Sequence, residues 1–129
     1  GNCVLPFKSA LMGAAEATLG TDAQGNPIHV PVQPVSVAYV GLYGIPMGRE
    51  NRPLFAWYGD MELVPHLIEA VKMGPIDVVV EFHPPLTVDQ VGGRKKLAGA
   101  TEAIVRAGQT RALRSMGKPV AAPLIEAAA

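Results

Sequence analysis

The densest run of β-branched side chains in the chain lies at Ile76–Phe82 (IDVVVEF). Such a run is typical of a strand that is covered by neighbours on both sides, so it predicts a central strand of a sheet. Pro84 and Pro85 follow shortly afterwards. Because proline has no amide hydrogen to donate to a sheet, we expect the strand to end just before them.

A second alternating pattern covers Ile28–Val40 (IHVPVQPVSVAYV), in which Val and Tyr side chains alternate with small or polar ones. This alternation predicts a strand. Pro31 and Pro34 interrupt its first half, which we therefore expect to be irregular or to lie at a sheet edge. The preceding Asp22–Pro27 (DAQGNP) consists of turn-forming residues and predicts a chain reversal.

Helical spacing of apolar residues predicts three helices. The first covers Phe7–Leu19, is largely buried and ends at Gly20. The second has Asp60 as its N-cap, ends near Gly74 and carries its apolar residues on one side, at Leu63, Leu67 and Val71. The third is a long surface helix over Arg94–Arg114, where apolar residues recur among charged ones.

The remaining segments are less regular. Gly41–Pro53 has the glycine, proline and mixed charge of a surface loop, and Leu54–Tyr58 (LFAWY) fits a short strand. We divide the chain into a domain part over residues 1–114 and a tail over residues 115–129, whose prolines and alanines show no period and favour disorder.

The order of these elements favours an α/β fold, with a partial layered sheet and flanking helices. Three strands or fewer make a thin sheet, whose missing neighbours leave an apolar edge or face exposed. We therefore expect self-association, as a homodimer through the exposed sheet edge.

Composition narrows the class of protein. Hydrophobic residues make up 49% of the 129 residues and charged residues 17%, which predicts a folded core. Lysine plus arginine and aspartate plus glutamate balance at 11 each, so nucleic acid is not an expected partner. Cys3 is the only cysteine, which excludes an internal disulfide and fits a reducing compartment.

No apolar run reaches the roughly 20 residues that a membrane-spanning helix needs. The chain begins at Gly1 without an initiator methionine, and we expect it to be a piece of a longer protein.

Candidate chemistry is sparse. The three histidines, His29, His66 and His83, are far apart in the sequence and show no metal-ligand spacing, so no metal site is expected. His83 follows the Ile76–Phe82 strand, where active-site residues often lie in α/β sheets, although a structural role is the commoner one. No G-x-S-x-G motif surrounds any serine, and Cys3 is best explained as a small residue near the terminus.

Two basic features are candidates for anion binding. Gly92 and Gly93 precede Arg94–Lys96, which would suit a phosphate or an anionic lipid head group or would simply be a solvated face. Lys8 opens an otherwise apolar helix, where it would either pair with a substrate phosphate or extend its ammonium into solvent.

Four motifs carry a resemblance to a known family. The segment LPFKSALMGAAE at residues 5–16, followed by VPVQPVSVAYV at 30–40, resembles the second half of the glycerol-phosphate acyltransferase superfamily, particularly bacterial 1-acyl-glycerol-3-phosphate acyltransferases. FAWYGDMELVPHL at 55–67 and VVVEFHPPL at 78–86 are also similar to the family, so the resemblance runs from Val4 to Arg114.

This resemblance implies an incomplete glycerolipid acyltransferase domain. The full-length enzyme would move a fatty acyl group from acyl-CoA or acyl-carrier protein to a lysophospholipid, with no cofactor, at the cytoplasmic face of the membrane and in peripheral contact with it. The family's catalytic H-x-x-x-x-D motif is not found in the chain, because no aspartate follows His29, His66 or His83 at the spacing that the motif requires. We therefore expect this chain alone to be inactive.

The resemblance also implies substrate-binding residues. These are Lys8, near the acceptor phosphate, and Val32, Pro34 and Val35, along the acyl or acceptor channel. Two alternatives stay open. One is a related enzyme, such as a lyso-ornithine lipid acyltransferase. The other is a non-enzymatic α/β lipid-binding or interaction module, which would use Arg94, Lys95 and Lys96 as its anionic contact.

Overall fold

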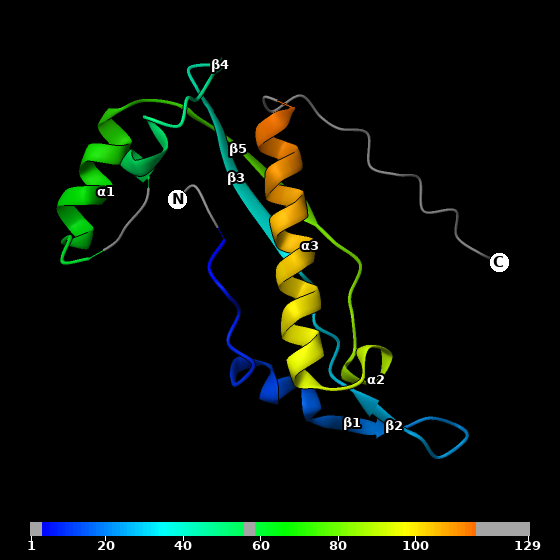
Figure 1. The fold of residues 1–129 in the computed structure, drawn as a ribbon. Helices are drawn as coiled ribbons and strands as arrows, with labels where there is room; N and C mark the ends of the chain where they lie inside the picture. The colour runs from blue at the N-terminus through cyan, green and yellow to red at the C-terminus, as the bar shows by residue number, and fades with distance from the viewer. Residues whose placement is uncertain (1–3, 56–58, 116–129) are drawn as a thin grey trace.

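The computed structural model describes residues 4–55 and 59–115, and it has the expected α/β character (Figure 1). Short antiparallel sheets are flanked by helices, which confirms the predicted fold class. The elements, in chain order, are η1 (Leu11–Glu16), β1 (Thr18–Thr21), β2 (Pro27–His29), β3 (Val35–Leu42), β4 (Ile45–Pro46), η2 (Arg52–Phe55), α1 (Leu63–Lys72), β5 (Ile76–Phe82), α2 (Val88–Val91) and α3 (Arg94–Arg114), where η denotes a 3-10 helix.

The main sheet has three strands in the order β4-β3-β5, and both pairs are antiparallel. The bounds predicted for the Ile76–Phe82 strand are confirmed as those of β5. Its predicted central position is wrong for the described residues, because β5 pairs with β3 alone and so lies at an edge. A run of β-branched residues indicates that a strand has apolar faces, but it does not indicate how many strands pair with it.

Helix α3 covers one face of this sheet, and its predicted range Arg94–Arg114 is confirmed. In Figure 1 it runs alongside β3. Small side chains face it from β3, where Ser36 and Ala38 are buried, and Ala112 of α3 packs against Ala38 and Val40. Small residues on both sides allow the helix and the strand to approach closely.

The opposite face of the sheet is apolar and largely open. Because side chains alternate along a strand, the neighbours of the buried β3 residues point away from α3. The register places Val35 opposite Phe82 and Val37 opposite Val80. All four of these side chains are exposed. At the far end of the same face, Tyr39 stacks on Phe55 of η2, with ring centroids 5.8 Å apart.

The N-terminal segment differs from its prediction. A helix over Phe7–Leu19 is wrong, because the helical part is the short η1 and the chain is already extended at Ala17 (φ −63°, ψ 137°). Residues Thr18–Thr21 form β1, which pairs with β2 as a small hairpin. The predicted chain reversal between them is confirmed, since the Asp22 carboxylate accepts hydrogen bonds from backbone amides two and four residues later. Closing this hairpin takes residues that helical spacing had assigned to a helix.

The expected strand over Ile28–Val40 is divided into β2 and β3, with the two prolines in the gap. This confirms the irregular first half. In the gap, the backbone of Val32 pairs with that of Leu86 in an isolated bridge. A second core lies below the sheet at this level, where Leu97 is fully buried among Ala15, Val88 and the partly buried Val32.

Three smaller expectations need correction in the middle of the chain. The loop over Gly41–Pro53 contains the two-residue strand β4. The short strand predicted from Leu54 starts instead within the 3-10 helix η2, and its residues 56–58 lie outside the described residues. Helix α1 forms as predicted and ends before Gly74, but its N-cap is Glu62, not Asp60. Of the predicted tail, residues 116–129 also lie outside the described part.

The buried position of Leu97 generates a stability prediction. Its side chain is 0% exposed, whereas that of Leu11 is 76% exposed. Leu97→Ala should lower the free energy of unfolding by about 2–5 kcal/mol, because it removes transfer free energy and leaves a cavity. Leu11→Ala is the matched control and should change it by about 0.5 kcal/mol or less. Urea unfolding followed by circular dichroism measures both, and equal losses would contradict the assigned core.

Candidate functional site

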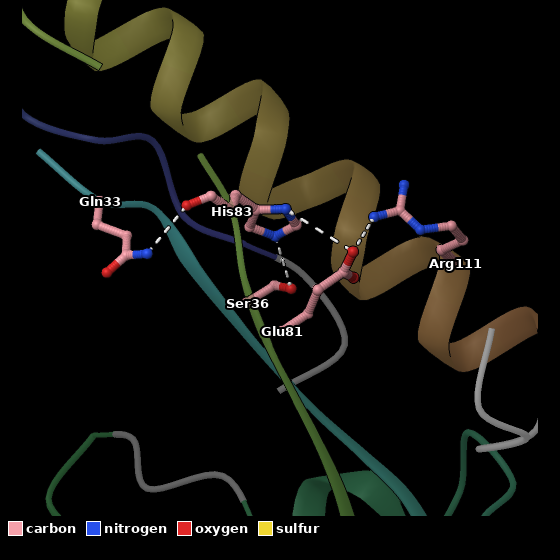
Figure 2. Close-up of polar contacts among 5 residues, drawn as sticks. All are labelled: Gln33, Ser36, Glu81, His83 and Arg111. Carbon is pink, nitrogen blue, oxygen red and sulfur yellow. Dashed lines mark hydrogen bonds and ion pairs between the residues drawn. The ribbon is translucent and has the colours of Figure 1, made fainter. Parts of the chain in front are cut away.

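A polar cluster joins the main sheet to α3, and Figure 2 shows its members. Ser36 and His83 are buried, Glu81 is half-buried and Arg111 is exposed. Ser36 comes from β3, Glu81 from β5, His83 from the residue after β5 and Arg111 from α3. Alternation places Ser36, Glu81 and His83 on the side of the sheet that faces the helix. A hydroxyl, an imidazole, a carboxylate and a guanidinium thus follow one another in consecutive contacts between the sheet and α3.

His83 is the centre of the cluster. Its Nε2 lies 3.0 Å from Ser36 Oγ, within hydrogen-bond distance, and its Nδ1 lies 3.8 Å from Glu81 Oε1. The same Glu81 oxygen accepts a 2.6 Å hydrogen bond from Arg111 Nη2. Because this carboxylate is already paired with a guanidinium, its negative charge is compensated beside the imidazole.

The backbone of His83 is also held in place by hydrogen bonds. Its amide donates to the Pro34 carbonyl oxygen at 3.0 Å, which extends the pairing of β3 and β5 past the end of the strands. Its carbonyl oxygen accepts a hydrogen bond from Gln33 Nε2 at 3.2 Å. Pro34 can take this place because only its carbonyl oxygen is needed there.

Ser36 contacts His83, and His83 in turn lies near Glu81, so the three side chains form the same series of serine, base and carboxylate as in enzymes with a nucleophilic serine. The packing argues against such chemistry. Ser36 is 3% exposed and His83 is 7% exposed, and Gly108 of α3 lies directly above both. A Cβ atom at Gly108 would stand 2.8 Å from His83 Nε2 and in contact with Ser36 Oγ. No space is left for an acyl group, so the cluster serves as a polar joint that holds α3 on the sheet.

The other histidines are placed apart from this joint. His29 Nε2 lies 3.2 Å from Asp89 Oδ1, and its Nδ1 lies 3.1 Å from the Glu16 carbonyl oxygen. His66 is on α1. Within residues 4–55 and 59–115, no three side chains of the metal-binding types are grouped so that they could hold an ion.

The four substrate-binding residues implied by the family resemblance lie in different surroundings. Lys8 is exposed just before η1. Val32 packs against the core around Leu97, and Pro34 is buried beside His83. Val35 is exposed on the open face of the main sheet. Their roles in binding substrate remain predictions.

A tie between the N-terminal segment and α3 was not predicted from the sequence. The Phe7 amide donates to Glu102 Oε2 at 3.2 Å, and Arg106 Nη2 donates both to the Val4 carbonyl oxygen and to Glu102 Oε1. The hydrogen bond from Arg106, followed by that from the Phe7 amide, lowers the pKa of Glu102. These bonds place the segment that carries Lys8 along α3.

Within the described residues, no helix has the length and apolar character needed to cross a membrane. No protein-family model matches the chain, and no solved structure matches it. The class of protein is therefore set by the α/β fold, the four sequence motifs and similarity to curated proteins.

That similarity confirms the resemblance to glycerolipid acyltransferases. The chain is 48% identical over 107 residues to a protein of Brucella abortus, 39% identical over 98 residues to one of Rhizobium meliloti and 40% identical over 108 residues to one of Rhodobacter capsulatus. These matches cover 83%, 76% and 81% of this chain, respectively.

Each of the three relatives is named a lyso-ornithine lipid O-acyltransferase. The chain spans 39%, 32% and 34% of their respective lengths, which agrees with the expectation that it corresponds to one part of such an enzyme.

Alanine substitutions at two glycines of α3, Gly99 and Gly108, should change the free energy of unfolding in opposite directions. A Cβ at Gly99 meets nothing within 4 Å, whereas one at Gly108 meets Ser36 and His83. Gly99→Ala should raise the free energy of unfolding by about 0.5–1 kcal/mol, since alanine is the better helix former. Gly108→Ala should lower it by about 1–3 kcal/mol through overpacking. Thermal or urea unfolding decides this, and a gain in stability at both sites would contradict the close approach.

Proposed function

We propose that this chain is part of an acyltransferase that transfers a fatty acyl group to the free hydroxyl of a lyso-ornithine lipid. The observation that carries the proposal is the 39–48% identity to three proteins with that name. The sequence motifs alone support only the coarser class, an acyltransferase of lysolipids, and they favoured a 1-acyl-glycerol-3-phosphate acceptor. The relatives' names favour the ornithine-containing acceptor instead.

In the proposed reaction, the acceptor hydroxyl oxygen attacks the thioester carbonyl of acyl-CoA or acyl-carrier protein. The new ester bond forms as the C–S bond breaks, and the hydroxyl proton ends on the released thiol. A general base must take that proton from the hydroxyl. The buried His83 is enclosed beneath Gly108. We therefore assign the base to a part of the full-length enzyme outside these 129 residues.

The open sheet face supports a role as part of a larger domain. Valine side chains on both β3 and β5 point away from α3 and are exposed. In a complete domain, a sheet face as apolar as this one is usually covered by another layer. We infer that the rest of the enzyme covers this face. A second copy of the chain is the alternative cover, and it would form a homodimer through this face, whereas the homodimer expected from the sequence uses the exposed sheet edge.

Helix α1 supports peripheral contact with the membrane in which the acceptor lipid resides. Its apolar side chains are exposed along one side, while the intervening positions carry polar groups such as His66 and Glu69. The exposed side chains are Leu63, Val64, Leu67, Ile68 and Val71. An amphipathic helix of this kind suits the interface between lipid head groups and acyl chains. We propose that α1 rests there, at the cytoplasmic face.

Activity assays on the full-length enzyme test the proposed function. With acyl-CoA or acyl-carrier protein as donor, it should acylate lyso-ornithine lipid with a kcat/KM at least about tenfold above that for 1-acyl-glycerol-3-phosphate, because a site shaped for one head group leaves polar groups unpaired with another. The 129-residue chain alone should show no turnover. Preference for the phosphorylated acceptor would contradict the finer assignment and leave the coarser class standing.

A pair of charge substitutions separates the two apolar surfaces. Val37 on the sheet face is 44% exposed and Ile68 on α1 is 49% exposed, so glutamate at either position is tolerated by the fold. Ile68→Glu should abolish co-sedimentation of the chain with phospholipid vesicles and leave its self-association unchanged. Val37→Glu should abolish self-association, measured by sedimentation velocity, and leave co-sedimentation with vesicles unchanged. If the two variants behave alike in both measurements, the assignment of separate roles is wrong.

A further inference from the structure

A cavity of about 490 Å³ lies between the segment around η2 and the C-terminal part of α3. Its lining is mostly polar and basic, and consists of Arg49, Arg52, Gln109, Thr110, Leu113 and Arg114. Two chain segments more than 50 residues apart thus place three guanidinium groups around one space. Thr110 and Arg114 also line a neighbouring cavity of about 460 Å³.

Arg52 carries the most specific observation. Its Nε is buried and has no hydrogen-bond partner among the described residues. Its Nη2 donates to the Met47 carbonyl oxygen at 3.4 Å, which is long for a hydrogen bond. A buried donor on a charged group is costly to leave unpaired, and each such donor calls for an explanation. An acceptor that enters the cavity would provide one.

The pairing of the other arginines strengthens this argument. Arg94, Arg106 and Arg111 of α3 each lie within 4.0 Å of a glutamate oxygen. No carboxylate within residues 4–55 and 59–115 makes such a pair with any of the three arginines of the cavity. Three like charges around one space repel one another unless an anion lies between them.

The position of Arg114 has a simpler explanation that accounts for only part of the pattern. A cation in the last turn of a helix is stabilised by the helix dipole, and Arg114 is in the last turn of α3. This does not explain why Arg49 and Arg52, from a different segment, face the same space. It also leaves the buried Nε of Arg52 without an acceptor.

We propose that this three-arginine cavity binds a phosphate group, with the guanidinium forks donating to its oxygens and Thr110 and Gln109 donating at the sides. Guanidinium groups suit phosphate because they offer parallel N–H donors and a permanent charge. The proposal rests on the proposed function for the source of that phosphate, which is the acyl donor, since coenzyme A and the prosthetic group of acyl-carrier protein both carry phosphates. The carboxylate of an ornithine head group is the competing source.

The side-chain Nε–Hε resonances of arginine provide a direct test in the 129-residue protein, which is small enough for NMR. Coenzyme A should shift the resonances of Arg49, Arg52 and Arg114 along a saturable curve, and inorganic phosphate should shift the same three more weakly. Arg114→Gln should weaken the affinity for coenzyme A by about tenfold, because it removes charge-assisted hydrogen bonds. Arg52→Lys should also weaken it, since lysine keeps the charge but loses the fork.

Arg94→Gln is the matched control, because it removes one exposed charge from the opposite end of the same helix. It should leave the affinity for coenzyme A within about twofold, as expected for a distant surface charge that is screened by salt. Equal losses from Arg94→Gln and Arg114→Gln would overturn the cavity as the site and favour the contact at Arg94–Lys96. The lack of any saturable shift with coenzyme A and with phosphate would also overturn it.

A third titration, with N-acetylornithine, separates the two sources of the anion. Tighter binding of this carboxylate than of coenzyme A would overturn the assignment to the acyl donor. Circular dichroism of each variant confirms that it is folded before its affinity is compared. These measurements need no turnover, so they give a result even if the full-length enzyme acylates a different acceptor.

Discussion

The close approach of α3 to β3 at Gly108 determines how the rest of the structure is arranged. Gly108 has no side chain, so Ser36 Oγ and His83 Nε2 can occupy the space beneath the helix and bond to each other there. The paired Glu81 and Arg111 complete the joint from the strand side and the helix side. A buried polar group stabilises a fold only when its partners are supplied, and here three elements supply them together.

This joint fixes which face of the sheet is covered. Because Ser36 faces α3, the alternation of the strand turns Val35 and Val37 outward, where Phe82 and Val80 stand opposite them. The covered face holds Ser36 beside the apolar Ala38 and Val40, while the open face carries valines as well, so both faces of the sheet are apolar. A sheet in a small independent domain more often has one polar, solvated face. Correspondence to about a third of the length of longer acyltransferases gives the second apolar face a physical reason, since a face that is open here would be an inner layer there.

The sequence predicted the elements whose pattern is local and strong. Both β5 and α3 have the predicted bounds, because a dense β-branched run and a long amphipathic repeat each decide a single conformation. The predicted Phe7–Leu19 helix failed because the Asp22 turn closes a hairpin that takes its last residues as β1. His83 was recognised as a candidate from its place after a strand, but its partner Ser36 lies 47 positions away in the sequence. Arg111, which pairs with Glu81, lies 30 positions from that residue, and only the tertiary structure brings these side chains together. Arg49 and Arg52 gave no signal in the sequence, because a mixed-charge loop does not reveal which of its charges lack partners.

The joint and the arginine cavity are mechanically linked through α3. Gly108 contacts the sheet, and the next two residues, Gln109 and Thr110, line the cavity. One turn later the pattern repeats, because Ala112 packs on the sheet and Leu113 and Arg114 line the cavity. In a helix these positions alternate between faces with a period of 3.6 residues, so a rotation of α3 that relieved crowding at Gly108 would also turn Arg114 relative to Arg52. The precision of the cavity therefore depends on the absence of a side chain at Gly108. If the cavity holds the acyl donor, the buried Ser36–His83 pair serves the reaction by fixing the angle at which α3 presents Arg114, without touching any reacting atom.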